Sequence, residues 1–331
     1  MLLVLASGAR AEDPPPEVHL LATGGTISGG RSGSLTAPDF AELVPGIDSV
    51  ARLSVEDYVT IGSSRMTPAI QLGLAQRVRE IFDKRPKLAG IVITHGTDSL
   101  EESAFLLDLL VDDARPVVFA AAQRPPRRTD TDGPRNLLNA VRLAASAGAQ
   151  GNGVLVTLND EIHAARDVRK THAIALDAFR SPGVGPVGYV DSGRVFLFHR
   201  PLRRLHIDTE RVEPKVTLVK LFAGSDGSQI RAAIESGQRG IVIEVFGRGN
   251  VPPGVMDAIR AARADDVTIV YVTRTGGGRV ELSDDTKRLG VIAGEDLDGL
   301  KARLVLVAAL GRTSDLDTLR GYFHTLSGAL D

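Results

Sequence analysis

Two short phrases of this sequence set threonine hydroxyls beside glycine. Residues 22–27 (ATGGTI) follow the first apolar run, and residues 93–98 (ITHGTD) close a later one. A threonine hydroxyl becomes an effective nucleophile when a base takes its proton, and backbone N–H groups in a glycine turn can stabilise the oxyanion that forms. Thr26 is therefore a candidate nucleophile. The alternative interpretation of its two glycines is a tight turn between a strand and a helix.

The second phrase adds a carboxylate to a hydroxyl. Thr97 and Asp98 are adjacent at the expected end of a strand, where Asp98 could receive the ammonium group of a ligand. The next residues, 99–102 (SLEE), match a capping box, which predicts that Ser99 caps the following helix. We expect His95 to be a packed or capping histidine rather than a base.

The phrase at residues 166–171 (RDVRKT) supplies a lysine. Most lysines in loops are simply solvated. If Lys170 is instead buried beside Thr97 and Asp98, burial favours its neutral amine, which can accept the proton of a threonine hydroxyl. The sequence alone leaves both interpretations open.

The elements that position these residues alternate between apolar strands and amphipathic helices. Strands that are apolar on both faces are typical of a parallel sheet covered by helices on both sides, with ligands at the carboxyl ends of the strands. The expected strands are residues 18–22, 91–93, 117–122 and 154–157, and the expected helices are residues 70–82, 100–110 and 134–147. A hairpin over residues 188–198, with DSG at its centre, closes this unit.

The pattern restarts after a basic, proline-flanked stretch. The second set comprises strands at residues 216–221, 241–246 and 268–272 and helices at residues 228–236, 254–263, 297–310 and 314–324. We therefore expect an α/β protein with a larger N-terminal domain, built on a mainly parallel, doubly wound sheet, and a smaller parallel α/β domain at the C-terminus. The expected boundaries are a leader at 1–16, a catalytic domain at 17–199, a linker at 200–214 and a C-terminal domain at 215–331.

Composition restricts the class of ligand. A chain of 331 residues, 43% hydrophobic, is long enough for two domains with sizeable cores. With 39 basic and 41 acidic residues it has a formal charge of -2, which argues against a nucleic-acid or anionic-membrane partner and favours a small neutral or zwitterionic ligand. The absence of cysteine excludes disulfides, zinc–cysteine clusters and a thiol nucleophile.

The N-terminus carries a weak export signal. Residues 1–6 (MLLVLA) form a short apolar run, and residues 9–11 (ARA) fit the small-x-small pattern of a signal-peptidase site. No basic residue precedes the run, which leaves two interpretations open: a leader whose true start lies upstream, or a frayed N-terminal tail. The leader interpretation favours a periplasmic or secreted protein, with a cytoplasmic location as the alternative.

Six phrases together are similar to those of one enzyme family. In order and spacing, from about Val18 to the C-terminus, the chain resembles the bacterial L-asparaginase/glutaminase family of the type II kind. The phrases are residues 23–27 (TGGTI), 61–64 (IGSS), 94–98 (THGTD), 124–125 (RP), 132–137 (DGPRNL) and 166–171 (RDVRKT). The resemblance implies a two-domain α/β amidohydrolase that needs no metal or organic cofactor. It also implies a homotetramer whose sites are shared between subunits.

The resemblance assigns roles to named positions. Thr26 matches the nucleophile, and Thr97, Lys170 and Asp98 match the group that relays protons and holds the substrate. The implied mechanism is attack of Thr26 on the side-chain amide of L-asparagine, release of ammonia and hydrolysis of the acyl-threonine ester by water.

The same comparison implies a set of substrate-binding positions. Ser63 matches a residue that contacts the α-carboxylate, and the carbonyl of Ala122 matches one that orients the amide nitrogen. Asn250 resembles the C-terminal-domain residue that reaches a neighbouring subunit's site. Glu281 is the nearest match to the glutamate that contacts the α-amino group, with the alignment open by a residue.

The chain also departs from the family pattern. Relatives carry a longer lid with a catalytic tyrosine after the position of residues 28–30 (SGG), whereas here RSGS leads directly to Leu35. Tyr58, on an apparent strand before Ile61, is a poor substitute for that tyrosine. Ser64 stands where many relatives have glutamine, and Gln123 and the basic residues 127–128 also differ. We therefore expect a more open site with weaker discrimination between substrates.

Several functions remain open at this stage. Within the enzymes, the alternatives are a glutaminase-asparaginase or a hydrolase of another small amide, such as that of a D-amino acid. From another class, a periplasmic amino-acid binding protein without turnover is possible, although binding alone would not require Thr26 and Lys170 together. A nicotinamide enzyme is disfavoured, because residues 23–26 (TGGT) lack the glycine spacing of the dinucleotide fingerprint.

Overall fold

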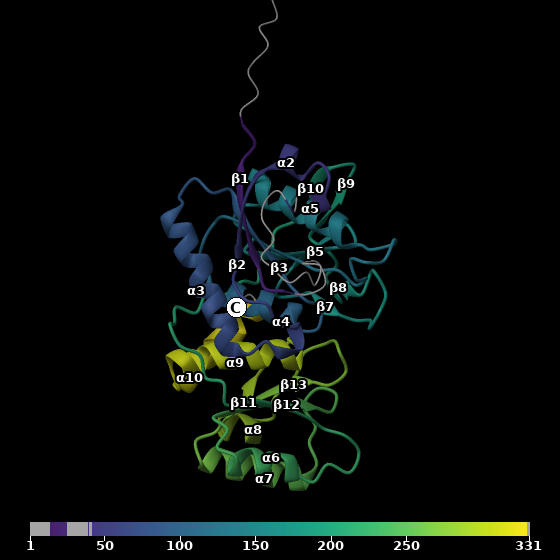
Figure 1. The fold of residues 1–331 in the computed structure, drawn as a ribbon. Coiled ribbons are helices and arrows are strands. Elements are labelled where there is room, and N and C mark those ends of the chain that lie inside the picture. The colour runs from purple at the N-terminus through teal and green to yellow at the C-terminus, as the bar shows by residue number, and fades with distance from the viewer. Residues whose placement is uncertain (1–13, 25–38, 40–41, 330–331) are drawn as a thin grey trace, which may run out of the picture.

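Two α/β domains lie one above the other (Figure 1). The computed structural model describes residues 14–24, 39 and 42–329. Residues 1–13 of the expected leader, Thr26 and the expected short lid at residues 28–37 lie outside these described residues. A stretch without helix or strand, residues 198–215, joins the two sheets. None of the helices in the described part of the chain is long and apolar enough to cross a bilayer.

The N-terminal domain is built on an eight-stranded sheet with strand order β10-β9-β6-β5-β4-β3-β1-β2. Five neighbouring strands run parallel: β1 (Glu17–Ala22), β2 (Arg52–Asp57), β3 (Gly90–Thr94), β4 (Val117–Ala120) and β5 (Val154–Leu158). The antiparallel strands β6 (Glu161–Ala164), β9 (Gly188–Asp191) and β10 (Arg194–Leu197) extend the sheet beyond β5. The sheet is therefore mainly parallel, as the sequence predicts.

Helices cover both faces of this sheet, because its strands are apolar on both sides. Side chains alternate along β1, so that Leu20 packs with the buried residues of α5 (Gly133–Ala145) and Leu21 with those of α3 (Pro68–Lys84) and α4 (Leu100–Leu110). The short helix α2 (Ile47–Val50) and the 3-10 turns η1 (Ser63–Arg65) and η2 (Ala147–Ala149) lie in connections. A two-stranded ribbon, β7 (Arg169–Lys170) with β8 (Phe179–Arg180), stands apart from the large sheet.

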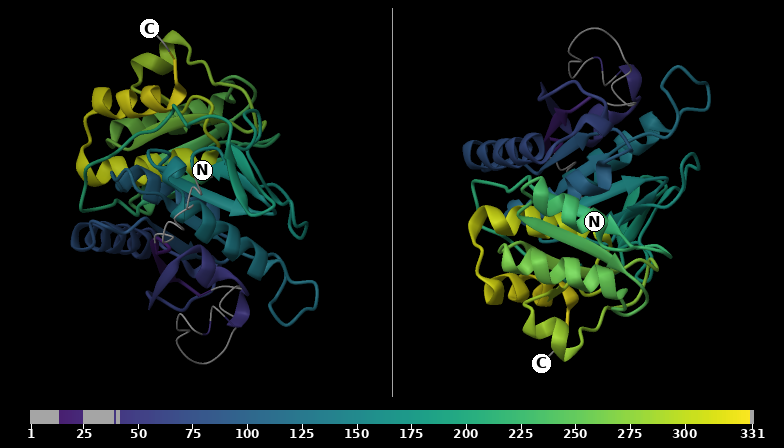
Figure 2. Two further views of the ribbon diagram at one scale, coloured as in Figure 1. Left: turned by 90° about the horizontal axis from the view of Figure 1, so that it is seen from above. Right: turned by 90° about the horizontal axis from the view of Figure 1, so that it is seen from below.

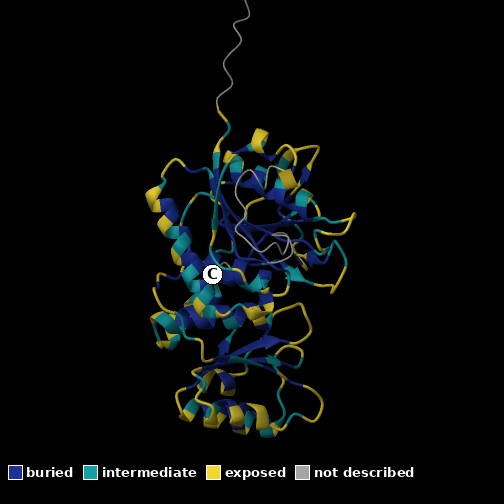
Figure 3. Ribbon diagram, in the orientation of Figure 1, coloured by how far each residue is buried: buried dark blue, intermediate teal, exposed yellow. Residues whose placement is uncertain are grey.

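The C-terminal domain has a smaller, entirely parallel sheet. Its strands are β11 (Val216–Lys220), β12 (Gly240–Val245), β13 (Thr268–Thr273) and β14 (Ile292–Ala293), in that order. The helices α6 (Ser228–Glu235) and α7 (Pro253–Ala264) cover the outer face, where Figure 3 shows their exposed side in yellow. The remaining helices are α8 (Asp284–Arg288), α9 (Gly299–Arg312) and α10 (Leu316–Ser327).

The inner face of the small sheet is covered by α9, which also packs against α4 of the N-terminal domain. Figure 1 shows the yellow helices α9 and α10 between the two sheets, and Figure 2 shows the same chain from above and from below. One cluster of buried apolar residues accordingly runs through both domains, from Phe105 of α4 to Leu304 of α9 and Phe323 of α10. The domains share a core at this junction.

The two-domain α/β prediction is confirmed, with small differences at the ends of elements. β4 ends at Ala120, two residues before the expected end. The next carbonyl, that of Ala121, instead accepts a hydrogen bond from Asn136 Nδ2 at 2.9 Å. The expectation that Tyr58 lies on a strand before Ile61 is wrong, because Tyr58 follows the last residue of β2. The hairpin at residues 188–198 is present as β9 and β10.

Candidate active site

The connections after β1 and β3 meet at one edge of the large sheet. From β1 the chain passes to β2 on one side and then to β3 on the other, so the carboxyl ends of β1 and β3 form a topological switch point, where open α/β sheets bind ligands. Thr23 ties these two ends together, since its Oγ1 donates to the carbonyl of Thr94 at 2.8 Å. The first phrase therefore begins directly beside the second.

Gly24 is the last described residue before Thr26, and its backbone requires glycine for two reasons. Its φ is 89°, in the left-handed region that side chains with a Cβ rarely adopt. A Cβ would also lie 2.8 Å from the carbonyl oxygen of Ile61. The glycine thus lets the chain that leads to Thr26 run against the segment that leads to Ser63. Thr26 itself lies outside the described residues, two positions further along the chain.

A hydroxyl, an ammonium group and a carboxylate meet at the same edge. Lys170 Nζ donates to Thr97 Oγ1 at 2.8 Å and lies 3.6 Å from Asp98 Oδ1. The side chain of Lys170 is only 18% exposed, whereas that of Asp98 is 62% exposed. Lys170 therefore faces inward to the threonine, and the carboxylate is open to a ligand from solvent. These are the three side chains whose proximity the sequence could not decide.

Ser63 lies beside this group in η1 and is buried. Its Oγ accepts a hydrogen bond from the backbone N–H of Asp98 at 3.1 Å. Gly96 makes this approach possible, because a Cβ at Gly96 would lie 2.6 Å from Ser63 Oγ. Its neighbour Ser64 is exposed. The hydroxyl proton of Ser63 is not used in its bond to Asp98, so Ser63 can still donate to a ligand.

The predicted capping box at residues 99–102 is wrong. Ser99 is the N-cap residue of α4, but its side chain makes no hydrogen bond to the helix. Its Oγ instead donates to the carbonyl of Ser63 at 2.6 Å. The hydroxyl that the local pattern assigned to the helix end thus bonds to the carbonyl of a residue that is distant in the sequence. Ser99 therefore positions Ser63, a role that the local motif did not indicate.

Glu101, in the same first turn of α4, has a role that the sequence does not indicate. Its Oε2 accepts the backbone N–H of Lys170 at 2.8 Å, so α4 holds the strand that carries the lysine. Burial raises the pKa of this carboxyl, while the charge of Lys301 opposes the shift. Only its separation of 69 residues from Lys170 concealed the contact, since no local pattern links residues so far apart.

Ala122 is buried in the loop that follows β4. The carboxylate of Asp132 shapes this loop, because it accepts the N–H groups of Gln123 at 3.0 Å and Arg124 at 2.9 Å. Asn136 Nδ2 donates to Asp132 Oδ2 at 2.9 Å and completes the support. Both supporting residues, Asp132 and Asn136, belong to the motif at residues 132–137 (DGPRNL). That motif is the sequence signal that could have identified them.

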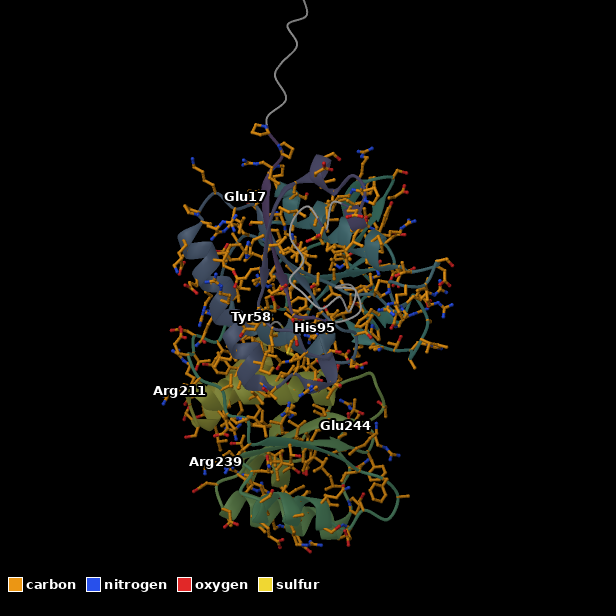
Figure 4. The ribbon with its side chains drawn as sticks, in the orientation of Figure 1. Glu17, Tyr58, His95, Arg211, Arg239 and Glu244 are labelled. Atoms are coloured by element: carbon orange, nitrogen blue, oxygen red, sulfur yellow. The ribbon has the colours of Figure 1, made fainter. Side chains whose placement is uncertain are left out.

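His95 is packed, as the sequence predicts, and does not serve as an exposed base. It is fully buried against Phe119, with ring centroids 5.7 Å apart, and Figure 4 labels it in the lower part of the N-terminal domain. Burial lowers the pKa of His95 to about 4, so the ring is neutral at pH 7. Its Nδ1 lies 2.7 Å from the carbonyl of Gly96, which makes this nitrogen the donor.

Tyr58 is engaged elsewhere. Its hydroxyl donates to the carbonyl of Ile70 in α3 at 3.3 Å, and Figure 4 shows it on the α3 side of the domain. Burial raises the pKa of this phenol, which disfavours its ionised form. Tyr58 is therefore tied to α3 rather than to Thr97 or Lys170.

Asn250 and Glu281 lie together in the C-terminal domain and are exposed. Glu281 pairs with Arg248 at 2.7 Å, and its backbone N–H donates to the carbonyl of that arginine. In the described part of the chain, no hydrogen bond or ion pair joins Asn250 or Glu281 to Lys170. Within one chain, Asn250 and Glu281 therefore lie near each other and do not contact Lys170 at the sheet edge.

Charged side chains at the edge do not gather as a metal site. The described residues contain no group of three or more histidines and carboxylates placed to hold a metal ion. What the arrangement offers is a short relay, from the ammonium group of Lys170 to the hydroxyl of Thr97, next to an open carboxylate. Such an arrangement can move a proton to or from a nucleophile and bind a ligand's amino group.

Family models match nearly the whole chain. A model described as asparaginase, N-terminal, matches residues 17–203, and a model described as glutaminase/asparaginase C-terminal domain matches residues 215–323.

Relatives align over almost their full length. A protein named probable L-asparaginase periplasmic, from Haemophilus influenzae, is 35% identical over 326 residues, which cover 93% of each chain. Glutaminase-asparaginase of Pseudomonas fluorescens biotype A is 32% identical over 98% of this chain and 95% of its own. The crystal structure of a probable cytoplasmic L-asparaginase from Campylobacter jejuni superposes with a TM-score of 0.87 at 35% identity, covering 93% of this chain and 99% of that one.

Proposed function

This chain belongs to the asparaginase family and is a hydrolase of amide substrates, and we propose that it converts L-asparagine to L-aspartate and ammonia. The observation that carries the proposal is the contact of Lys170 Nζ with Thr97 Oγ1 at 2.8 Å, at the sheet edge where the chain leads to Thr26. A protein that only bound an amino acid would not need a lysine aimed at a threonine hydroxyl.

We assign the nucleophile to Thr26. Its hydroxyl oxygen attacks the side-chain amide carbon, backbone N–H groups of the glycine turn stabilise the oxyanion, and ammonia leaves as the acyl-threonine ester forms. Water then attacks the ester, which releases L-aspartate and restores the threonine hydroxyl. Thr97 and Lys170 act as the proton relay, a contribution typically worth about 100-fold to 10,000-fold in rate.

The same edge offers groups for the rest of the substrate. Asp98, open to solvent, pairs with the α-ammonium group, and the hydroxyl of Ser63 donates to the α-carboxylate. Ser64 is a further substrate-binding position, where many relatives have the longer glutamine that meets the amino group. The carbonyl of Ala122 receives the amide N–H. Each partner has the charge or donor type that asparagine requires, which supports a zwitterionic amide as the substrate.

We propose that the enzyme acts as a homotetramer in which Asn250 and Glu281 reach a neighbouring subunit's site. Their exposure, and the lack of a hydrogen bond or ion pair from either residue to Lys170 in the described part of the chain, support a role outside their own chain's site. We also propose a periplasmic or secreted location, supported by the apolar N-terminal run and by a relative named periplasmic. The structural neighbour named cytoplasmic supports the alternative.

A second activity, on L-glutamine, is favoured by two observations. Relatives from Pseudomonas fluorescens and Pseudomonas aeruginosa, at 32% and 30% identity, are named glutaminase-asparaginase. Ser64 is also a short side chain, which leaves room near the bound amino acid. We therefore expect measurable, slower release of ammonia from L-glutamine.

The direct test is ammonia release from L-asparagine, L-glutamine and D-asparagine by the purified protein and by Thr26→Ala. Because removal of a nucleophile eliminates the covalent route, the variant should lose about a thousandfold or more in kcat while it keeps the far-ultraviolet circular dichroism of the wild type. Thr325→Ala, an exposed threonine on α10, is the matched control and should keep full activity. Full activity in Thr26→Ala would overturn the assignment. A folded wild type that binds L-asparagine in calorimetry but releases no ammonia would point to a binding protein instead.

A further inference from the structure

The strand that carries Lys170 is held by the C-terminal domain at several points. Lys301 Nζ, on α9, donates to the carbonyl of Ala165. Arg166 pairs with Asp296 at 2.7 Å, and Arg169 pairs with Asp298 at 2.7 Å. The segment from Ala165 to Lys170 is thus fastened at its first two residues and at Arg169 by residues that lie more than a hundred positions further along the chain.

Lys301 is an unusual residue for a helix that packs at a domain junction. It is 2% exposed, and its Nζ lies 5.1 Å from the ring centroid of Phe105 in α4. Burial lowers the pKa of Lys301 to about 8, against the favourable charges of Asp298, Glu101 and Asp167. Lysine is almost never fully buried unless its charged group has partners.

Glu101 connects this lysine to the site. Its carboxylate is buried and holds the backbone N–H of Lys170 at 2.8 Å. Burial raises the pKa of Glu101, and the positive charge of Lys301 opposes that rise. The contacts therefore run from α9 through α4 to the lysine that touches Thr97.

We propose that Glu101 and Lys301 are positioning residues for Lys170, so that α9 of the C-terminal domain sets the geometry of the proton relay in the N-terminal domain. Neither residue touches the substrate. Glu101 fixes the backbone of Lys170, and Lys301 anchors Ala165, where the same segment begins. This inference rests on the proposed function, in which Lys170 serves Thr97.

Three substitutions in the first turn of α4 test the Glu101 contact. Glu101→Leu removes the acceptor and should lower kcat about 100-fold, because misplacement of a catalytic group by about 1 Å costs about that much, while KM changes less than about threefold. Glu101→Gln keeps an acceptor oxygen and should recover most of kcat. Glu102→Leu removes a charge from the same turn, where the helix dipole acts equally, and should leave kcat near the wild-type value.

Lys301 is tested independently by Lys301→Met, which keeps the aliphatic stem and removes the ammonium group. We expect kcat to fall about tenfold at unchanged KM, since Ala165, where the segment that carries Lys170 begins, then loses its anchor. Lys287→Met, at an exposed lysine of α8 in the same domain, is the matched control and should behave as the wild type.

Backbone amide exchange gives a readout that does not depend on activity. In Glu101→Leu and Lys301→Met, the peptide that contains the Lys170 amide should exchange faster than in the wild type, and in Glu102→Leu and Lys287→Met it should not. If the wild type hydrolyses no amide, the proposed function fails, and the exchange rates still decide whether Glu101 and Lys301 hold Lys170. Folded Glu101→Leu and Lys301→Met variants with wild-type kcat and wild-type exchange would overturn the inference. If Glu101→Leu does not fold, the comparison of Lys301→Met with Lys287→Met decides it.

Discussion

At the scale of single residues, the placement of Ser63 depends on the absence of one methyl group. Gly96 has a backbone conformation that alanine can adopt, yet a Cβ there would lie 2.6 Å from Ser63 Oγ and 2.9 Å from Ser63 Cβ. The substitution Gly96→Ala must therefore push Ser63 away from Asp98. The displaced Ser63 can then no longer donate to the α-carboxylate of the substrate, and the loss of such a hydrogen bond to a charged group costs about 1.5–3 kcal/mol of binding free energy. We expect KM for L-asparagine to rise about 10-fold to 100-fold.

Steady-state kinetics of Gly96→Ala measure this effect. Gly321→Ala makes the same chemical change on α10, where a Cβ meets nothing within 4 Å, and should leave KM unchanged. An unaltered KM in Gly96→Ala would mean that Ser63 does not hold the substrate. A fall in kcat alone would instead place the main effect on the relay at Thr97.

The sequence predicted the residues that could do chemistry better than it predicted the residues that position them. Thr97, Asp98 and Lys170 were singled out by residue type and by their place after strands, and the structure brings the three side chains together. What the sequence could not supply was the set of contacts between distant residues. Ser99 illustrates the limit, since its local pattern indicated a cap and its hydroxyl instead donates to the carbonyl of Ser63.

At the scale of elements, the turn after β3 is buried around a neutral histidine. The pKa of His95 is about 4 in the folded protein and near 6.5 in an unfolded chain. As the pH falls from 6.5 toward 4, His95 becomes protonated in the unfolded chain but stays neutral in the folded protein. The free energy of unfolding therefore decreases in that range. The loss amounts to about 3 kcal/mol by the conversion of pKa units to free energy.

Replacement by a side chain that does not titrate should remove this loss. In His95→Gln, the free energy of unfolding in urea should fall between pH 7 and pH 4 by about 3 kcal/mol less than in the wild type. Urea titrations of both proteins at several pH values give the comparison directly. Parallel pH profiles for the two proteins would show that His95 is protonated in the folded state or that its turn opens before the protein unfolds.

Long, periodic elements were predicted well and short ones were not. The pattern of α4 predicted Leu100 to Leu110, and the helix has those bounds because its apolar face packs against two neighbours. β2 was indicated only as an apparent strand at Tyr58, one residue beyond its true end, since its burial is intermediate and charged residues stand at both ends. β7 and β14 have two residues each, too few to show any period, and only tertiary contacts hold them in place.

At the scale of the whole molecule, the two domains share one hydrophobic cluster. It joins residues of the large sheet, such as Phe119, to α4, then to α9, and on to Val242 of the small sheet. The restart of the strand–helix pattern predicts two domains. The hydrophobic periodicity of α9, however, cannot show that this helix packs against both domains. Separation of the domains would expose the apolar faces of α4 and α9 together.

We therefore predict that both domains unfold in a single transition. The chain lacks cysteine, so one buried thiol can report on each domain: Val141→Cys lies between the large sheet and α5, and Val255→Cys lies against the outer face of the small sheet. Both side chains are fully buried, and the exchange of valine for cysteine changes volume little. Because a shared core couples the two parts, the thiols should become reactive at the same urea concentration when measured at one protein concentration. Reactivity of Val255→Cys at clearly lower urea would mean that the C-terminal domain opens by itself, and the control of Lys170 by α9 would then be lost before the large sheet unfolds.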